Sequence, residues 1–422
     1  MHNRAVPSRP FRWLALCVTL LAACNTAGPS VTTTSQAPSS AAPSSAVAPP
    51  SSSAVPAGSF VVSPKPDTSV SPVPLLGALP TTKLDAATSK RLQAALDRSV
   101  AARAGPDLIA AVITPDGTWA GATGIDGPKA RPAQVGDEFA IASVSKMVLA
   151  AIVMRLAEQG KIELDAPLAS YLHGVNVDAN GATVRQALAM RSGLGDTIAS
   201  AFDRVRADCG RAWTREDVLA SIPTPFAGPN TVFHYSNPTY KLLGFAVEDV
   251  TGQSLAAALK AEVLDPVGVG DRMLLQGPHS TTPKPWALPI AAHGDPLELS
   301  KYGTGGALPC LADATLSLGA AGMASDVSSL ARWGWDLFAG HVVSRDSLAS
   351  MMDIGADDYG LGMQRFGDFL PEVVYGHTGS KDGYKAILVY VPARQTVAAV
   401  FINDGSADEI NYARDLLDAI RP

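Results

Sequence analysis

A hydroxyl and an amine stand three residues apart at the start of an apolar stretch. Ser143 and Lys146 open a segment that is apolar on nearly every face and carries no Pro or Gly before Gly160. That pattern predicts a helix running to about residue 159 and buried on all sides. Because residues at i and i+3 share one face of a helix, the two side chains meet at its N-terminus.

This placement suits nucleophilic catalysis. The partial positive charge of a helix N-terminus helps to stabilise an oxyanion and favours the neutral form of Lys146. A neutral lysine beside a serine gives an activated nucleophile. The alternative is a capping Ser143 and a Lys146 whose stem packs while its ammonium reaches solvent. This stretch alone leaves both interpretations open.

Two later stretches carry further polar groups. Tyr235 and Asn237 precede a proline in a turn. The segment His377-Thr378-Gly379-Ser380 lies at the end of a predicted strand. Taken alone, the first indicates a core tyrosine before a turn. The second alone indicates polar residues at a strand edge with a turn glycine.

Together, the three stretches resemble the signature of the penicillin-recognising serine hydrolases. The order Ser-x-x-Lys, Tyr-x-Asn and His-Thr-Gly is typical of that family, which includes D-alanyl-D-alanine carboxypeptidases, class C β-lactamases and related esterases and D-amino-acid peptidases. The segments 188–194 (Leu-Ala-Met-Arg-Ser-Gly-Leu) and 322–325 (Gly-Met-Ala-Ser) are also similar to family motifs. The resemblance covers about residues 85–422.

The resemblance implies roles for individual residues. Ser143 is expected to be the nucleophile, and Lys146 and Tyr235 to share the proton transfers, with their order left open. The backbone N–H groups of Ser143 and Ser380 are expected to form the oxyanion hole.

The remaining motif residues are expected to bind substrate. Asn237 is expected to bind the substrate amide, and His377 and Thr378 to orient the substrate and tune the proton-transfer pair, with Gly379 beside them. Class C β-lactamases mostly carry lysine where this chain has His377. A neutral imidazole is a poorer counter-ion for a carboxylate, which argues against efficient β-lactam hydrolysis. Arg191 also departs from the usual threonine, and the sequence gives no physical account of it.

Elements at both ends of this region must position these groups. Alternating or apolar runs predict strands at 108–114, 118–123, 373–375, 384–391 and 396–402. Helices are predicted at 85–104, 184–190, 215–222, 240–251, 254–264, 326–338 and 407–420. Residues 271–318 are rich in Pro and Gly and are predicted to form a long loop.

The predicted fold class is α/β (α+β), with an antiparallel sheet flanked by helices and built from N- and C-terminal parts. A helical subdomain at about 144–318 is inserted in it, as in the β-lactamase/transpeptidase fold. The active cleft is expected between the two parts.

The N-terminal part carries targeting features. Residues 1–23 resemble a secretory signal, with three arginines before a short apolar core. Leu21-Ala22-Ala23-Cys24 resembles the bacterial lipobox, in which the cysteine thiol receives a diacylglycerol; the alternative is an ordinary cleavage site. Residues 24–84 are dominated by Ser, Thr, Ala and Pro, which predicts a disordered tether before the hydrolase domain at 85–422. Lipidation predicts an extracytoplasmic protein anchored to the bacterial cell membrane.

Two cysteines remain in the mature chain. In an oxidising compartment, Cys209 and Cys310 are expected to form a disulfide. The alternative is two buried thiols, because spacing in sequence does not place their Cα atoms within bridging distance.

Composition narrows the function classes. With 422 residues and a net charge of −6, the chain lacks the basic patches of a nucleic-acid-binding protein. Its histidines are scattered without metal spacing, no Gly-x-Ser-x-Gly occurs, and no Gly-rich loop follows a strand. We therefore expect a serine hydrolase without metal or cofactor, acting on amide or ester bonds of a small-molecule or peptidoglycan-like substrate. The alternative is a non-hydrolytic lipoprotein that keeps the fold and binds peptidoglycan. The oligomeric state stays open.

Overall fold

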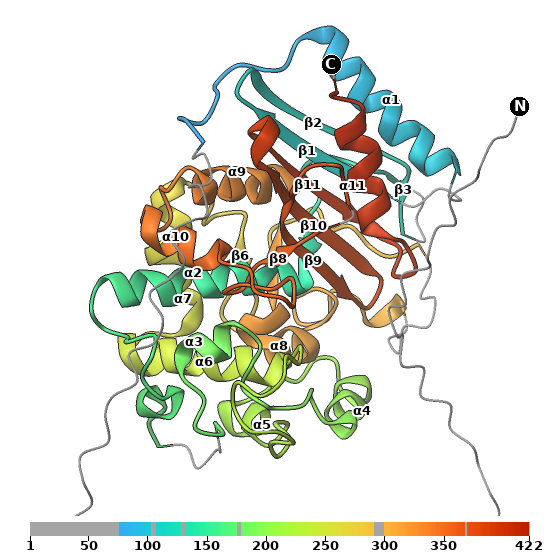
Figure 1. Ribbon diagram of the computed structural model, residues 1–422. Coiled ribbons are helices and arrows are strands. Elements are labelled where there is room, and N and C mark those ends of the chain that lie inside the picture. Colours follow the sequence, from blue (N-terminus) through green and yellow to red (C-terminus); the bar gives the residue numbers. More distant parts are fainter. Residues whose placement is uncertain are drawn as a thin grey trace, which may run out of the picture. The chain divides into compact units, whose positions relative to one another are not determined.

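A six-stranded antiparallel sheet joins the two ends of the folded chain in the computed structural model (Figure 1). The structure describes residues 76–102, 107–127, 131–174, 179–290, 299–367 and 369–421, all within one unit, Thr68–Pro422. The strands, in their order across the sheet, are β2 (Gly117–Thr123), β1 (Leu108–Thr114), β11 (Thr396–Ile402), β10 (Tyr384–Val391), β9 (Tyr375–Lys381) and β8 (Gln364–Arg365). The predicted sheet of N- and C-terminal strands is therefore confirmed.

Burial explains why the central strands are continuous apolar runs. Ile109 of β1 lies opposite Phe401 of β11, and neither is exposed. Alternate residues of β1, β10 and β11 point to opposite faces, and each face is covered by helices. Strands buried on both faces carry no polar alternation. The bounds of β1, β10 and β11 are those that the sequence predicts.

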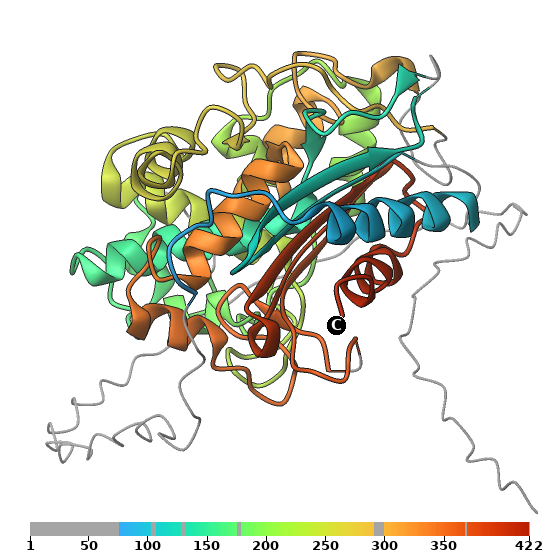
Figure 2. The same ribbon diagram turned by 90° about the horizontal axis from the view of Figure 1, so that it is seen from above.

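Helices cover both faces of the sheet (Figure 2). One face packs against α1 (Ala86–Ala102) and α11 (Glu409–Asp418). The other face packs against α9 (Val327–Phe338), whose Phe338 ring stacks on Tyr390 of β10 with centroids 4.3 Å apart. The helices predicted near these positions are confirmed, with ends shifted by at most two residues.

The helical part lies between β5 and β9 in sequence and below the sheet in Figure 1. Its helices are α2 (Ser145–Glu158), α3 (Val184–Leu188), α4 (Ala199–Ala207), α5 (Arg215–Leu219), α6 (Asn237–Thr251), α7 (Leu255–Leu259), α8 (Leu311–Ala321) and α10 (Arg345–Met352). Two small sheets complete the described part: β5 (Phe139–Ala140), β7 (Met323–Ser325) and β6 (Leu274–Leu275) in one, β3 (Ile125–Asp126) and β4 (Arg131–Pro132) in the other.

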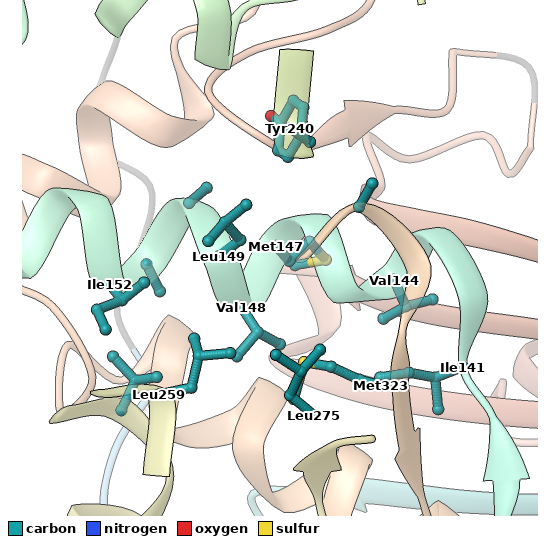
Figure 3. Packing of buried hydrophobic residues seen from close by; sticks show 14 of the residues in the cluster. Ile141, Val144, Met147, Val148, Leu149, Ile152, Tyr240, Leu259, Leu275 and Met323 are labelled. Carbon is teal, nitrogen blue, oxygen red and sulfur yellow. The ribbon is translucent and has the colours of Figure 1, made fainter. Parts of the chain in front are cut away.

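Helix α2 runs through the core between the sheet and the other helices. Figure 3 shows Val148 and Ile152 of α2 near Leu259 of α7 and Leu275 of β6. Eleven of its fourteen residues are buried, which confirms the helix buried on all sides. The α-helix begins at Ser145, however, because residues Ala142–Val144 form a separate 3₁₀ turn.

The prediction of a loop over 271–318 is wrong at both ends. Leu274–Leu275 pairs with β7, and α8 begins at Leu311. Helix α8 is made of small and apolar residues buried on most sides, so it lacks the polar face by which an amphipathic helix is recognised. Helix α4 was predicted only as part of the helical subdomain, without bounds of its own, and helix α10 was not predicted.

Several predictions concern residues outside the described part: the signal at 1–23, the lipidated Cys24 and the tether up to residue 75. The prediction of a disordered tether is wrong for its last residues, 76–84, because Leu76 and Leu84 are buried and their N–H groups donate to the carbonyls of Phe338 and Thr118. Among the described residues, no helix is both long and apolar enough to cross a membrane.

Candidate active site

Ser143 and Lys146 face each other where the 3₁₀ turn meets α2. The Lys146 Nζ lies 3.1 Å from the Ser143 Oγ. Ser143 is half-buried, whereas Lys146 has no exposed surface. Ala142, directly before the serine, has φ of +47°, a conformation that costs a non-glycine residue free energy and often occurs at functional sites.

The surroundings of Lys146 favour the neutral amine. Burial is the main cause that lowers its pKa well below the usual value for lysine, and the carboxylate of Asp196 opposes this shift. The Nζ donates to the Asn237 Oδ1 at 2.8 Å and to the Ala320 carbonyl at 2.7 Å. A neutral amine has two N–H bonds, which these two acceptors use, so its lone pair is left for the hydroxyl of Ser143.

Tyr235 completes a three-residue contact around the nucleophile. It lies in the loop before α6, where Ser236 caps the helix. The Lys146 Nζ lies 4.7 Å from the centroid of the Tyr235 ring, and the phenol lies close enough to the Ser143 side chain for their interaction to affect the pKa of Tyr235. Burial raises the pKa of Tyr235 above its usual value, although the interaction with Ser143 opposes the shift. The phenol is therefore protonated at neutral pH and can donate a proton.

Strand β9 brings a backbone donor to the same place. The Thr378 N–H donates to the Gln364 Oε1 at 3.0 Å rather than to β10. Because N–H groups of alternate residues point to the same side of a strand, the N–H of Ser380 also points away from β10. The turn that holds Ser143 packs on this strand.

Gly379 allows this close approach. A Cβ on Gly379 would lie 2.4 Å from the carbonyl oxygen of Ile141 and 3.2 Å from the Cβ of Ala142. Any side chain there would push β9 away from the turn. Ser380, the next residue, is exposed.

His377 is buried and bonded at both ring nitrogens. Its Nδ1–H donates to the Thr378 carbonyl at 2.6 Å, and the Tyr359 hydroxyl donates to its Nε2 at 3.2 Å. Burial is the main cause that lowers the pKa of His377 to about 3, and Lys146 adds to the shift. The ring is thus neutral, as the sequence suggested. It contacts Tyr359 rather than presenting a free nitrogen to substrate.

Asn237 bridges two functional groups. Its Oδ1 accepts from Lys146, and its Nδ2 donates to the Asp196 carboxylate at 3.1 and 3.3 Å. The amide that was expected to bind substrate therefore already orients Lys146. Thr378 is half-buried, and its hydroxyl lies 3.3 Å from the Gln364 Oε1.

Sequence reasoning missed Tyr359, Asp196 and Gln364. Each lies in a polar or Gly-rich segment whose composition indicates only a loop. Arg191, which had no explanation in the sequence, forms an ion pair with Asp357. It thus ties the segment after α3 to the segment that carries Tyr359.

Cys209 and Cys310 lie side by side as free thiols. Both are buried, and each thiol affects the pKa of the other. Burial raises the pKa of both thiols. The structure thus has the second of the two predicted alternatives, although it brings the pair into contact.

Within the described ranges, no group of three or more His, Cys, Asp or Glu side chains is placed to hold a metal ion. A surface hollow between α1 and α11, lined by Arg98, Ser99 and Asp415 among others, lies on the far face of the sheet from α9.

Comparison with known proteins gives a consistent answer. Residues 92–420 match the family described as "Beta-lactamase". Penicillin-binding protein 4 of Amycolatopsis lactamdurans is 30% identical over 302 residues, which cover 64% of this chain and 73% of that protein. Esterase EstB of Burkholderia gladioli is 35% identical over 156 residues, but these cover only 33% of this chain and 39% of the esterase.

Solved structures agree on the fold. The D-amino acid amidase from Ochrobactrum anthropi SV3, in complex with L-phenylalanine, superposes with a TM-score of 0.66 at 21% identity, covering 79% of this chain and 98% of the amidase. A D-stereospecific amidohydrolase from Streptomyces sp. gives 0.63 at 23% identity, covering 79% and 97%. These likenesses confirm the predicted β-lactamase/transpeptidase-like fold.

Proposed function

Because the chain belongs to the Beta-lactamase family, whose members are serine hydrolases, we propose that it cleaves amide or ester bonds through an acyl-enzyme on Ser143. The observation that carries this proposal is the contact of the Ser143 hydroxyl with both Lys146 and Tyr235. A neutral amine and a protonated phenol on one hydroxyl supply the base and the acid that acyl transfer needs.

Each group of the site has its own role in the reaction. Lys146 accepts the Ser143 proton while the Oγ attacks the carbonyl carbon of the substrate. The resulting oxyanion is stabilised by the N–H groups of Ser143 and Ser380. Tyr235 protonates the leaving amine or alcohol as the C–N or C–O bond breaks, and the proton held on Lys146 passes to the Tyr235 phenolate, so both groups regain their starting forms. Water then attacks the ester on Ser143, which releases the acid and restores the hydroxyl.

We also propose that the protein is exported and lipid-anchored through Cys24. The basic n-region, the short apolar core and the lipobox-like sequence before Cys24 support this proposal.

In an oxidising compartment, the adjacent thiols of Cys209 and Cys310 would lose two electrons and two protons to the oxidant of that compartment and form a disulfide. Counting thiols in the unreduced, denatured protein tests this step, and two free thiols besides Cys24 would contradict it.

Turnover measurements test the reaction class. Purified protein is assayed with short-chain p-nitrophenyl esters, D-amino-acid amides, D-Ala-D-Ala peptides and nitrocefin. We expect turnover of an ester or amide, loss of at least about 10³-fold in Ser143→Ala, and little nitrocefin hydrolysis because His377 is neutral. Ser145→Ala is the matched control, since the Ser145 hydroxyl bonds only to the backbone of Ala142 and Met323. Equal activity of Ser143→Ala and the wild type would reject the proposal.

A further inference from the structure

Asp196 is connected to Lys146 through a single side chain, that of Asn237. It follows Gly195 in the segment after α3, and its carboxylate is exposed. Asn237 connects it to Lys146, which in turn contacts Ser143. The carboxylate therefore lies at the mouth of the site, within the reach of a substrate whose carbonyl is held at Ser143.

This carboxylate is fixed in place but not neutralised. It accepts from the Asn237 side chain and, at 2.7 Å, from the Thr197 N–H. None of the salt bridges formed by the described residues includes it. The buried Lys241 donates to the Thr197 hydroxyl at 2.9 Å and forms no ion pair with Asp196. An exposed carboxylate oxygen with a fixed position and no cationic partner is an acceptor for an ammonium group.

Among the described residues, the two basic side chains of β9, His377 and Lys381, already have partners. His377 is buried, and both its ring nitrogens are bonded. Lys381, directly after Ser380, is paired with Asp313 at 2.6 Å and also donates to Ser317. A substrate carboxylate would thus meet the negative charge of Asp196 without compensation.

Exposed apolar side chains follow Asp196 in the chain, and one of them lies beside Gly195. Of the six exposed large hydrophobic residues among those described, four fall in the segment after it: Ile198, Phe202, Phe226 and Val232. Phe226 is 57% exposed, and its Cδ1 would lie 4.0 Å from a Cβ on Gly195. An apolar group next to a fixed carboxylate suits a substrate with a hydrophobic side chain beside an amine.

We propose that Asp196 binds the ammonium group of the substrate, which is an amide or ester of an amino acid with a free amino group and an apolar side chain. This assignment rests on the proposed serine hydrolase activity and names its substrate class. Carboxylate recognition of the ammonium selects for cationic substrates over neutral substrates of the same shape.

Matched substrates isolate the charge effect. The two enantiomers of phenylalanine p-nitroanilide carry the ammonium, 3-phenylpropionyl p-nitroanilide lacks it, and N-succinyl-phenylalanine p-nitroanilide is anionic. For the wild type, kcat/KM should fall in that order for one enantiomer. The ratio of kcat/KM for the cationic substrate to that for the neutral one should be about tenfold to hundredfold, the range of a hydrogen bond to a charged group.

The variants assign that ratio to Asp196. In Asp196→Asn the ratio should fall toward one, even if both activities change because Asn237 is perturbed. Asp203→Asn is the control, because Asp203 is an exposed acid that pairs with Arg206 on α4, and its ratio should equal that of the wild type. An unchanged ratio in Asp196→Asn, or a wild-type preference for the neutral or anionic substrate, would overturn the inference.

The proposed function is checked separately in the same protein. Labelling of Ser143 by a fluorophosphonate requires no ammonium, so labelling without a cationic preference rejects only the assignment of Asp196. Absence of both labelling and turnover in the wild type rejects the hydrolase proposal and this inference with it.

Discussion

The groups around Lys146 determine its protonation state. It is buried without a carboxylate in contact, and two carbonyl oxygens accept its N–H bonds. Protonation would bury a third N–H and a full charge, which is costly away from water. The residue is therefore held as an amine whose lone pair faces the Ser143 hydroxyl. Asp196 is the principal charge that opposes this.

The pH dependence of acylation follows from this balance. The rate of acylation should rise with pH as Lys146 loses its proton. The midpoint of this rise should lie well below the usual pKa of lysine. Asp196→Asn removes a negative charge that favours the ammonium form of Lys146, so the midpoint of the rise in rate should move to lower pH. The rate of fluorophosphonate labelling measured against pH tests this. A shift to higher pH, or no shift, would contradict the electrostatic account.

His377 should make stability depend on pH. Its pKa is about 3 in the folded protein, against an ordinary value of 6.5. Between these values the unfolded chain binds a proton that the folded chain does not, so the free energy of unfolding falls as pH falls below about 6.5. The loss is about 1.4 kcal/mol for each pH unit within that window.

Thermal unfolding between pH 7.5 and 4.5 tests this prediction. The wild type should lose more stability than His377→Gln over that range. His279→Gln, at an exposed histidine, is the control and should follow the wild type. Parallel curves for all three proteins would show that His377 does not titrate as the structure requires.

For individual residues, the sequence predicted which side chains form the site, but it did not predict all of their hydrogen-bond partners. Ser143 and Lys146 were paired by helical spacing, and Tyr235 by resemblance. The partners of His377 and Asn237 depend on where the segments with Tyr359 and Asp196 fold back. Those segments carry no periodic pattern, so only the tertiary structure shows these contacts.

Among the elements, β9 and the 3₁₀ turn before α2 set the geometry of the site. They approach so closely that a side chain at Gly379 has no room. Predicting β9 was difficult because its residues Tyr375–Lys381 are mostly polar or glycine, and a strand at a cleft lacks the apolar run of a core strand. In contrast, β1, β10 and β11 are apolar and were predicted with their ends.

Gly379→Ala tests the role of this contact. The added Cβ should displace β9 from the turn and misplace the N–H of Ser380, which should lower kcat/KM by about 10²–10³, as the loss of one oxyanion donor does. Gly136→Ala is the control, because nothing lies within 4 Å of a Cβ there. Steady-state kinetics together with circular dichroism separate this effect from unfolding. Normal kcat/KM in Gly379→Ala would show that β9 does not form the oxyanion hole.

Over the whole molecule, the sheet joins strands from both ends of the folded chain, with the helical part between them in sequence (Figure 1). The nucleophile lies in the 3₁₀ turn that leads into α2, Tyr235 comes from the loop before α6 in the helical part, and β9 belongs to the sheet. The resemblance to a known family predicted this organisation. Periodicity alone predicted the sheet but misassigned α8, because a helix buried on most sides lacks an amphipathic pattern.

The N-terminal proposal makes a prediction for the full chain. Every residue assigned to the site lies between residues 143 and 380, so Cys24→Ala should leave kcat/KM unchanged while it removes the lipid anchor. In a bacterial host with lipoprotein processing, the wild type should partition with membranes and the variant should not. Membrane association of Cys24→Ala equal to that of the wild type would contradict lipidation at this residue.

The central claim is that the Ser143 hydroxyl is the nucleophile, activated by Lys146. Mass spectrometry of the protein treated with a fluorophosphonate, followed by peptide mapping, tests it most directly. We predict one adduct per chain, on Ser143, absent from Ser143→Ala and strongly slowed in Lys146→Ala. An adduct on another residue, or one of equal yield in Ser143→Ala, would contradict the account.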